Sequence, residues 1–235
     1  MTIDKSIKAC LFDMDGLLLN TEDIYTLTCN EILNKYGKGP LTWDIKLKLQ
    51  GLPGREAGEK LIESYDLPIS FEEYDDMNVK SQESKWPTSS FLPGVVELLK
   101  YLHEKNIPTA VCTSSNKLKF KGKTSHLPCF ENFDVIVTGD DPRIPAGRGK
   151  PCPDIWQLGL KMLNEKFGGD IKPSECLVFE DGIPGVKSGK AFGAHVIWVP
   201  HPEAQPYLGD VDGILDNKGE LLPTLQAFKR EQYGL

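Results

Sequence analysis

The sequence lacks any long hydrophobic run. No segment reaches the roughly 20 consecutive apolar residues that a membrane-spanning helix needs. The first residues, Met1-Thr-Ile-Asp-Lys-Ser-Ile-Lys, carry charges where a secretion signal would need an apolar stretch. These absences predict that the protein has no membrane partner, and they favour the cytoplasm as its location, with the nucleus as an alternative.

Closely spaced cysteines are also absent, although the chain contains six cysteines. They are scattered singly, with no Cys-x-x-Cys pair and no Cys/His spacing typical of a zinc site. Cys10, Cys112 and Cys176 each lie in an apolar run, where a cysteine behaves as a small hydrophobic residue. We therefore predict structural roles for all six.

Basic character is lacking as well. The formal net charge is -7, and no compact cluster of lysine and arginine offsets it. Nucleic-acid binding depends on such a basic surface, so the sequence predicts no nucleic-acid partner. At 235 residues the chain has room for a core domain with a smaller inserted module. A monomer is the default expectation.

Short apolar runs alternate with helical patterns after about residue 90. The expected strands are 7–13, 108–113, 133–138, 176–180 and 195–199. Strands that are short and almost continuously apolar are typical of a parallel sheet covered on both faces. Since helical spacing of leucine and valine fills the segments between them, we predict an α/β fold with a doubly wound parallel sheet.

Residues 18–86 interrupt this alternation, because helical patterns fill them throughout. One expected helix carries Tyr25, Cys29, Ile32 and Tyr36 on a single stripe, and others are expected near 43–50, 55–65 and 71–85. The sequence therefore predicts an α/β catalytic core formed by 1–17 and 87–235, with an all-helical cap domain, 18–86, inserted after the first strand.

Acidic residues follow two of the predicted strands. Asp13 and Asp15 end the first strand, before Gly16 allows a sharp turn, and Glu180 and Asp181 end a later one. Because ligands bind beyond the carboxyl ends of strands in an open α/β sheet, these residues could bind a cation or transfer protons. Since Asp13 and Asp15 are two positions apart, we expect them to project to the same side. Taken alone, each pair could also be a solvated acidic turn.

Hydroxyl groups and one lysine complete a set that suits phosphoryl transfer. Thr113, Ser114 and Ser115 end another strand, where hydroxyls and free N–H groups can bind an anion, although Ser115 fits a helix N-cap better. Lys150 precedes a proline-initiated helix. A carboxylate that attacks a phosphate dianion needs a divalent metal and a lysine to offset charge repulsion. An oxygen-rich site favours Mg²⁺.

The order of these motifs resembles that of the haloacid-dehalogenase superfamily of hydrolases. The matching segments are Phe12-Asp-Met-Asp-Gly, Gly149-Lys-Pro-Cys-Pro-Asp and Phe179-Glu-Asp-Gly, and the likeness covers nearly the whole chain. Several stretches, among them Val111-Cys-Thr-Ser-Ser and Thr138-Gly-Asp-Asp-Pro, are closer still to the pseudouridine-5′-phosphatase branch. The segment 18–86 takes the place of the family's helical cap.

The resemblance implies a Mg²⁺-dependent phosphatase that acts on a small phosphomonoester, with a nucleoside or modified nucleoside 5′-monophosphate favoured. Asp13 would attack phosphorus and form an aspartyl-phosphate. Asp15 would protonate the leaving group and then activate the hydrolytic water. Loss of Asp13 should therefore abolish turnover.

The resemblance also implies binding roles. The implied magnesium ligands are Asp13, the backbone carbonyl of Asp15, Asp181 and, as a direct ligand or a hydrogen-bonded neighbour, Glu180. The implied phosphate contacts are Thr113, the backbone N–H of Ser114 and Lys150. In the cap, Arg55 is the candidate for reaching the substrate, with an ordinary surface arginine as the alternative. For Tyr25, packing in the cap core is favoured over a place in the cleft.

Two other functions remain open at this point. Related phosphomutases share the motifs but carry a histidine near the position of Tyr25, so a sugar-phosphate phosphomutase is one alternative. A non-catalytic phosphate-binding regulatory protein is the other. Asn20, where the pseudouridine-5′-phosphatase branch usually has an aspartate, and the stretch 143–148, which differs from that branch, leave the substrate open.

Overall fold

Six parallel strands form one sheet in the computed structural model, which describes residues 7–50, 52 and 54–235. They are β1 (Ala9–Phe12), β2 (Thr109–Cys112), β3 (Val135–Val137), β4 (Cys176–Glu180), β5 (His195–Trp198) and β6 (Gly219–Leu221), in the order β3-β2-β1-β4-β5-β6. Every neighbouring pair is parallel. The predicted α/β class with a doubly wound parallel sheet is confirmed, and the short edge strand β6 is an addition to it.

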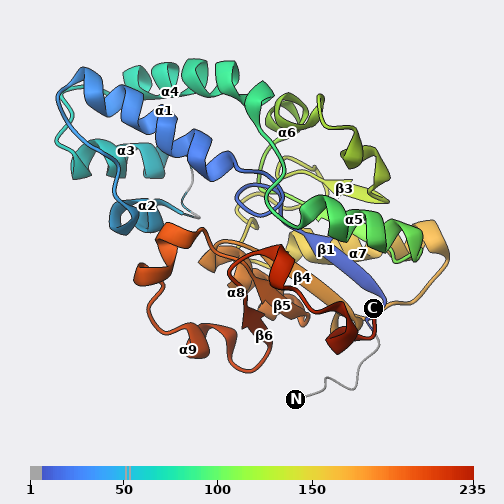
Figure 1. Ribbon diagram of the computed structural model, residues 1–235. Helices are drawn as coiled ribbons and strands as arrows, with labels where there is room; N and C mark the ends of the chain where they lie inside the picture. The colour runs from blue at the N-terminus through green and yellow to red at the C-terminus, as the bar shows by residue number, and fades with distance from the viewer. Residues whose placement is uncertain (1–6, 51, 53) are drawn as a thin grey trace.

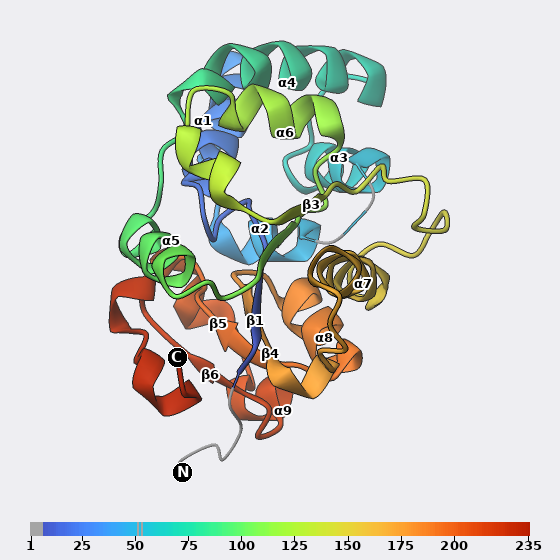
Figure 2. The same cartoon turned by 90° about the vertical axis from the view of Figure 1, so that its right-hand side faces the viewer.

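Helices cover both faces of the sheet, as Figures 1 and 2 show. On one face, α7 (Asp154–Phe167) and α8 (Ile183–Phe192) pack against alternate strand residues in a cluster that includes Leu160 and Val186. On the other face, α5 (Val95–Glu104) and the C-terminal segment form a second cluster with Leu99 and Phe228. All residues of β1, β2 and β4 are buried, which explains their continuous apolar character.

Four helices separate β1 from α5, the helix that leads back into the sheet. They are α1 (Thr21–Lys35), α2 (Trp43–Leu49), α3 (Gly54–Ser64) and α4 (Phe71–Lys85), of which the last three lie close to their predicted ranges. They pack around a cluster of their own, formed by Ile32, Leu33, Leu41, Leu61, Leu67 and Tyr74. A capping box between Ser70 and Glu73 begins α4. The predicted ranges 1–17 and 18–86 also include residues 1–6, 51 and 53, which lie outside the described residues.

The two chain connections between the helical segment and the sheet run side by side. The N–H of Asn20 donates to the carbonyl of Ser90 at 3.0 Å, and the N–H of Ser90 donates to the side-chain oxygen of Asn20 at 2.8 Å. Leu18 and Leu19, just before them, are completely buried in the core. The chain therefore leaves and re-enters the α/β part at one place.

A second contact joins the helices to the α/β part on the far side of the site. Trp43 of α2 stacks on His201, with ring centroids 4.6 Å apart, and its indole N–H donates to Glu203 at 2.8 Å. His201 also lies 3.2 Å from a carboxylate oxygen of Asp23 in α1. These contacts hold the helical segment above the carboxyl end of the sheet.

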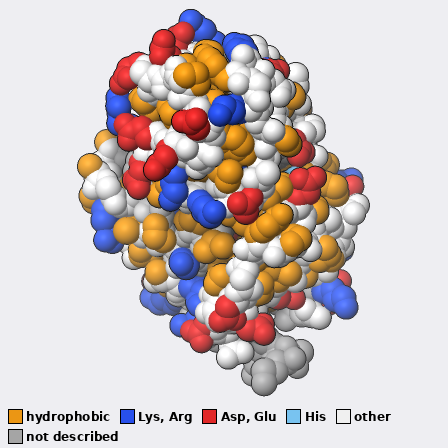
Figure 3. Space-filling model, turned by 90° about the vertical axis from the view of Figure 1, so that its left-hand side faces the viewer, with side chains coloured by type: hydrophobic (Ala, Val, Ile, Leu, Met, Phe, Trp, Pro, Cys, Tyr) orange, Lys and Arg blue, Asp and Glu red, His pale blue; other side chains and the backbone are white. Residues whose placement is uncertain are grey.

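The surface carries charges of both signs. On the face drawn in Figure 3, acidic and basic side chains are interspersed over the helical segment rather than gathered by sign. Within the described ranges, no helix is both long and apolar enough to cross a membrane. The six cysteines are free thiols, and Cys10, Cys112 and Cys176 are buried in the strands as predicted.

Candidate active site

A cavity of about 800 Å³ opens at the carboxyl end of the sheet, below the helical segment. Asp13, Glu180 and Asp181 line it from the ends of β1 and β4, and Lys150 lines it from the loop before α7. Tyr25, Gln50 and Leu52 line it from the helical segment. Strand ends that are far apart in the sequence thus meet at one cavity, as expected for a parallel sheet.

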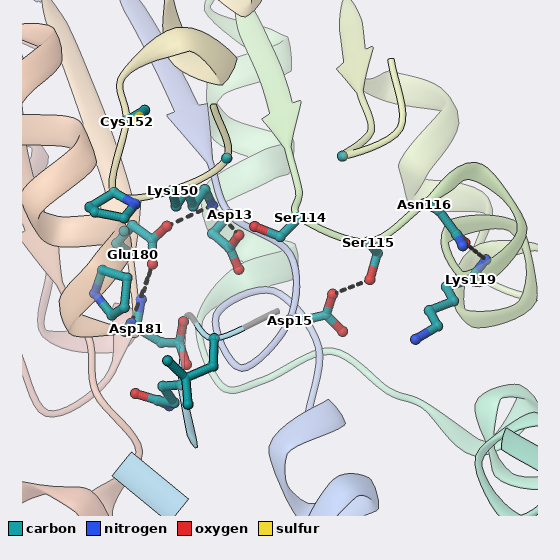
Figure 4. Close-up of a pocket in the computed structure, with 18 of the residues that line it drawn as sticks. Asp13, Asp15, Ser114, Ser115, Asn116, Lys119, Lys150, Cys152, Glu180 and Asp181 are labelled. Atoms are coloured by element: carbon teal, nitrogen blue, oxygen red, sulfur yellow. Dashed lines mark hydrogen bonds and ion pairs between the residues drawn. The ribbon is translucent and has the colours of Figure 1, made fainter. Parts of the chain in front are cut away.

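A buried lysine joins two carboxylates at the centre of this cavity (Figure 4). The ammonium of Lys150 donates to Asp13 and, at 2.7 Å, to Glu180, and all three side chains are less than a tenth exposed. Burial raises the pKa of Asp13 to about 7; Lys150 opposes this shift, while repulsion from Glu180 and Asp15 adds to it. Burial works against the charge on Lys150, but attraction to Asp13 and Glu180 outweighs it and raises the pKa of the lysine.

Three carboxylates lie close enough to share one cation. Oxygens of Asp13, Glu180 and Asp181 lie within 4.8 Å of one another. Burial, followed by repulsion from Glu180, raises the pKa of Asp181 well above its ordinary value. Buried carboxylates in such a group repel one another unless a cation neutralises them, and purely oxygen ligands suit a hard divalent cation. The cluster is therefore a candidate metal site.

The Glu180 carboxylate is fixed against the start of α8. It accepts hydrogen bonds from the backbone N–H groups of Asp181 at 3.1 Å and Gly182 at 3.3 Å. A Cβ added to Gly185 would lie 1.8 Å from a Glu180 carboxylate oxygen, so only glycine allows this close approach. The N-terminus of a helix also interacts favourably with a nearby carboxylate, so the start of α8 suits the position of Glu180.

Asp15 lies in a separate group of hydrogen-bond donors. One of its oxygens accepts from Ser115 at 2.8 Å and from Thr113 at 3.3 Å, and the other accepts from Tyr25 at 3.3 Å and from Lys123. Burial alone would raise the pKa of Asp15, but attraction to Lys123 and the hydrogen bonds lower it. The pKa of Asp15 is therefore shifted in the opposite direction from that of Asp13.

The two aspartates of the first motif do not point the same way. Figure 4 shows the carboxylate of Asp13 turned toward Lys150 and that of Asp15 turned toward Ser115. Both side chains line the same cavity, as expected, but their carboxylates have different partners. β1 ends at Phe12, and the chain has already left the strand at Asp15. The two carboxylates are therefore paired with different lysines and have opposite pKa shifts.

The sequence pattern of the haloacid dehalogenase-like hydrolases matches residues 10–199. This range contains both acidic strand ends, Lys150 and the helical segment between β1 and α5. The chain belongs to the haloacid dehalogenase-like hydrolases. The predicted family is confirmed.

Several relatives of this hydrolase are phosphatases by name. It is 69% identical to the probable pseudouridine-5′-phosphatase of Saccharomyces cerevisiae, with 100% of each chain covered. It is 33% identical to (DL)-glycerol-3-phosphatase 2 of Arabidopsis thaliana, over 98% of this chain and 92% of that one. A Deinococcus radiodurans hydrolase of the family, solved with bound phosphate and sodium, has a TM-score of 0.72 at 24% identity, with 94% and 92% covered, and supports the fold. The hydrolase is a phosphatase of this family, as the sequence predicted.

Most predicted site residues of the hydrolase meet at the cavity. Asp13, Asp15, Ser114, Lys150, Glu180 and Asp181 all line it. Thr113 lies directly behind them, almost completely buried, and its hydroxyl donates to Asp15 and accepts from the N–H of Ser115 at 3.0 Å. The structure thus assembles all but one of the predicted residues.

Arg55 is the exception, and the structure does not bring it to the cavity. Its guanidinium pairs with Glu59 at 3.1 Å and Glu72 at 2.7 Å, lies over the ring of Phe71, and is 58% exposed. The start of α3 turns this side chain toward α4 rather than toward the sheet. The alternative of a surface arginine is therefore the correct one in this structure, and Gln50 and Leu52 are the neighbouring residues that line the cavity.

Three residues that contact Asp15 were missed or misplaced from the sequence. Tyr25 lies at the cavity instead of in the cluster between the helices, and Ser115 donates to Asp15, whereas Asn116 is the N-cap of α6 (Lys117–Thr124). Lys123 could not be predicted from the sequence, because α6 contains four lysines and such a composition is typical of a solvent-exposed helix. Nothing in the spacing of these lysines distinguishes the buried one.

Gly16 brings the first motif into contact with the candidate metal site. Its φ is +83°, and a Cβ added there would lie 2.3 Å from a carboxylate oxygen of Asp181. A side chain at this position would therefore displace the Asp181 carboxylate in addition to straining the backbone.

We expect Gly16→Ala to weaken divalent-cation binding and phosphatase activity by roughly tenfold or more, which corresponds to about 1.4 kcal/mol. Gly37→Ala is the matched control, because Gly37 also has a positive φ, +67°, but nothing within 4 Å of an added Cβ. Both variants strain the backbone, but only Gly16→Ala should lose metal affinity in a calorimetric titration. Equal metal affinity in the two variants would show that the contact with Asp181 is unimportant.

Proposed function

We propose that this phosphatase hydrolyses pseudouridine 5′-phosphate, or a closely similar small phosphomonoester, through a phosphorylated Asp13 and with Mg²⁺ as cofactor. The observation that carries the proposal is the cluster of Asp13, Lys150 and Glu180, which are buried, with the partly exposed Asp181 at the end of the sheet. It combines a carboxylate nucleophile with the positive charge that phosphoryl transfer requires. The substrate is favoured by the 69% identity with the yeast relative over the whole chain.

In the first step, a carboxylate oxygen of Asp13 attacks phosphorus and the bond from phosphorus to the ester oxygen breaks. The electron pair stays on that oxygen, which takes a proton from Asp15 and leaves as the alcohol. Lys150 and the backbone N–H of Ser114 are the proposed contacts to the phosphoryl oxygens, together with the hydroxyl of Thr113, which would have to turn from Asp15 to reach them. In the second step, Asp15 accepts a proton from water as the water attacks the aspartyl-phosphate, which restores Asp13 and releases phosphate.

The proposed magnesium ligands are Asp13, Asp181 and the backbone carbonyl of Asp15, with Glu180 as a ligand or as the hydrogen-bonded partner of Lys150. The three carboxylates supply only oxygen donors, which is the ligand chemistry that Mg²⁺ prefers. When bound, Mg²⁺ neutralises negative charge on the phosphoryl group. Lys150 already pairs with Asp13 and Glu180, so the chain itself supplies one of the positive charges.

The metal affinity should depend on pH through Asp13. The pKa of Asp13 is raised to about 7 in the folded protein, compared with about 4 in the unfolded chain. The protonated carboxyl therefore contributes to the stability of the folded state below about pH 4, and this contribution is lost as the pH rises through 7. Cation binding requires the ionised form. Because the pKa of Asp181 is raised as well, we expect the affinity for Mg²⁺ to rise by at least about tenfold per pH unit below pH 7. Titration calorimetry from pH 5.5 to 8.5 measures this, and a flat profile would contradict the raised pKa.

Phosphate release from a panel of phosphomonoesters tests the proposed substrate. The panel pairs pseudouridine 5′-phosphate with its isomer uridine 5′-phosphate and adds glycerol 3-phosphate and glucose 1-phosphate, each with and without Mg²⁺. The proposal expects the highest kcat/KM for pseudouridine 5′-phosphate. A preference for glycerol 3-phosphate would contradict the proposed substrate but not the proposed reaction mechanism. Conversion of glucose 1-phosphate to another phosphate ester, without net release of phosphate, would favour a phosphomutase.

We also propose that 18–86 acts as a cap over the site. The separate cluster around Ile32 and Tyr74 and the adjacent connections at Asn20 and Ser90 support this division. Because Leu18 and Leu19 belong to the core cluster, the proposed boundary lies at Asn20 rather than at residue 18. A monomer in the cytoplasm remains our prediction from the sequence.

A further inference from the structure

A lysine outside the family motifs is completely buried beside the cavity. Lys123, near the end of α6, has a side chain that is 0% exposed. Its ammonium donates to Asp15, to the hydroxyl of Tyr25 and, at 3.0 Å, to the hydroxyl of Ser115. A buried ammonium is stable only when its charge is paired and its three donors are used, and this arrangement meets both conditions.

The same group of residues determines where the Asp15 carboxylate points. Asp15 accepts four hydrogen bonds, two on each oxygen, and a carboxylate has about four acceptor positions. Lys123 is the charged member of the group, and it also binds Tyr25 and Ser115, two of the other three donors. Removing its ammonium would therefore weaken most of the contacts that orient Asp15.

Charge makes Lys123 difficult to replace. Among the described residues, it is the cation that forms an ion pair with Asp15, because Lys150 is bound to Asp13 and Glu180. Without Lys123, the Asp15 carboxylate would lie near Asp13 with no neutralising partner. Repulsion between two poorly hydrated carboxylates would then favour a different orientation of Asp15.

We propose that Lys123 is a positioning residue that holds Asp15 where it can transfer protons to the leaving group and from water. This inference rests on the proposed function of Asp15. The proton that Asp15 gives to the leaving oxygen as the ester bond breaks is one that it took from the attacking water in the preceding turnover, and the resulting carboxylate is again paired with Lys123. In the second step the carboxylate takes a proton from the attacking water, so each turnover returns Asp15 to its starting state.

The test compares esters whose leaving groups differ in their need for a proton. Pseudouridine 5′-phosphate and glycerol 3-phosphate release strongly basic alkoxides, whereas p-nitrophenyl phosphate releases a weakly basic phenolate. The parameter to compare is kcat/KM, because it ends at release of the alcohol and excludes the common second step. We expect Lys123→Met to lower kcat/KM for the alkyl esters roughly 10²-fold and for p-nitrophenyl phosphate by no more than about threefold.

Further measurements distinguish a change in the orientation of Asp15 from a loss of folded protein or of phosphate binding. Lys121→Met is the matched control, because Lys121 is an exposed lysine of the same helix, and it should retain full activity. The inhibition constant of inorganic phosphate should stay the same in Lys123→Met, since Lys123 acts on Asp15 and not on the phosphoryl site. Thermal unfolding of each variant shows how much of the protein is folded.

A double-mutant cycle keeps the test decisive even if Lys123→Met alone is unstable. Asp15→Asn with Lys123→Met removes both buried charges, so neither is left unpaired. In the Asp15→Asn background, Lys123→Met should cause no further loss of kcat/KM. A further loss there, an equal loss on alkyl and p-nitrophenyl esters, or full activity of Lys123→Met would each overturn the inference. If the proposed function itself is wrong, the result is different, because the wild-type protein then releases no phosphate from any of these esters.

Discussion

Asp13→Asn is expected to lower kcat by roughly 10⁴-fold or more on every phosphomonoester, because it removes the nucleophile. The amide cannot form the acyl-phosphate, although it keeps the shape of the carboxylate. The variant should fold, since loss of the repulsion between Asp13 and Glu180 compensates in part for the lost ion pair with Lys150. Phosphate release with saturating Mg²⁺ and substrate measures the effect.

The control for this variant is a substitution of an aspartate on the surface, away from the cavity. Asp76→Asn removes an exposed carboxylate of α4 that pairs with Lys80 at 2.7 Å. Such surface pairs contribute about 0–1 kcal/mol to stability, so both activity and melting temperature should be unchanged. Substantial activity of Asp13→Asn beside an unaffected Asp76→Asn would exclude a covalent intermediate on Asp13.

Lys150→Met should have the second-largest effect, and it should lower stability and activity together. The ammonium neutralises two buried carboxylates, and breaking a buried ion pair by removing one partner costs about 3–5 kcal/mol. Loss of its contact to the phosphoryl group should lower kcat/KM by roughly 10²–10³-fold. Saturating Mg²⁺ should restore part of the stability, because it neutralises the same carboxylates.

Lys161→Met provides the comparison for Lys150→Met. Lys161 is 71% exposed and lies 3.8 Å from Glu165 one turn further along α7, so its loss should change neither property measurably. Chemical denaturation with and without Mg²⁺, together with phosphate release, gives both effects. If Lys150→Met unfolded at the same denaturant concentration as Lys161→Met, the stabilising role of the buried pairs would be wrong.

The sequence was most informative where strand patterns placed chemically reactive residues. β1, β2 and β4 are buried on both faces, so their apolar runs were easy to recognise. Parallel strands end at the same edge of the sheet, which is sufficient to predict that Asp13, Glu180 and the hydroxyl residues after β2 meet. The strand β6 was missed because its three residues, Gly219–Leu221, are partly exposed and include a glutamate.

Side-chain directions on helices could not be predicted in the same way. Arg55 lies on α3, whose packing against α4 decides whether the arginine faces the cavity or Glu72. Lys123 is one of four lysines in α6, and only the position of α6 against Tyr25 and Asp15 buries this one. Such contacts depend on how separate elements pack together, and the spacing within one element does not contain that information.

The most direct test of the mechanism is to locate the phosphorylated residue during turnover. Sodium borohydride reduces an aspartyl-phosphate to homoserine, and peptide mass spectrometry then identifies the position. The account predicts homoserine at position 13 when the protein is quenched during hydrolysis with Mg²⁺, and none in Asp13→Asn or without substrate. Rapid phosphate release with no modification of Asp13, or with modification elsewhere, would contradict it.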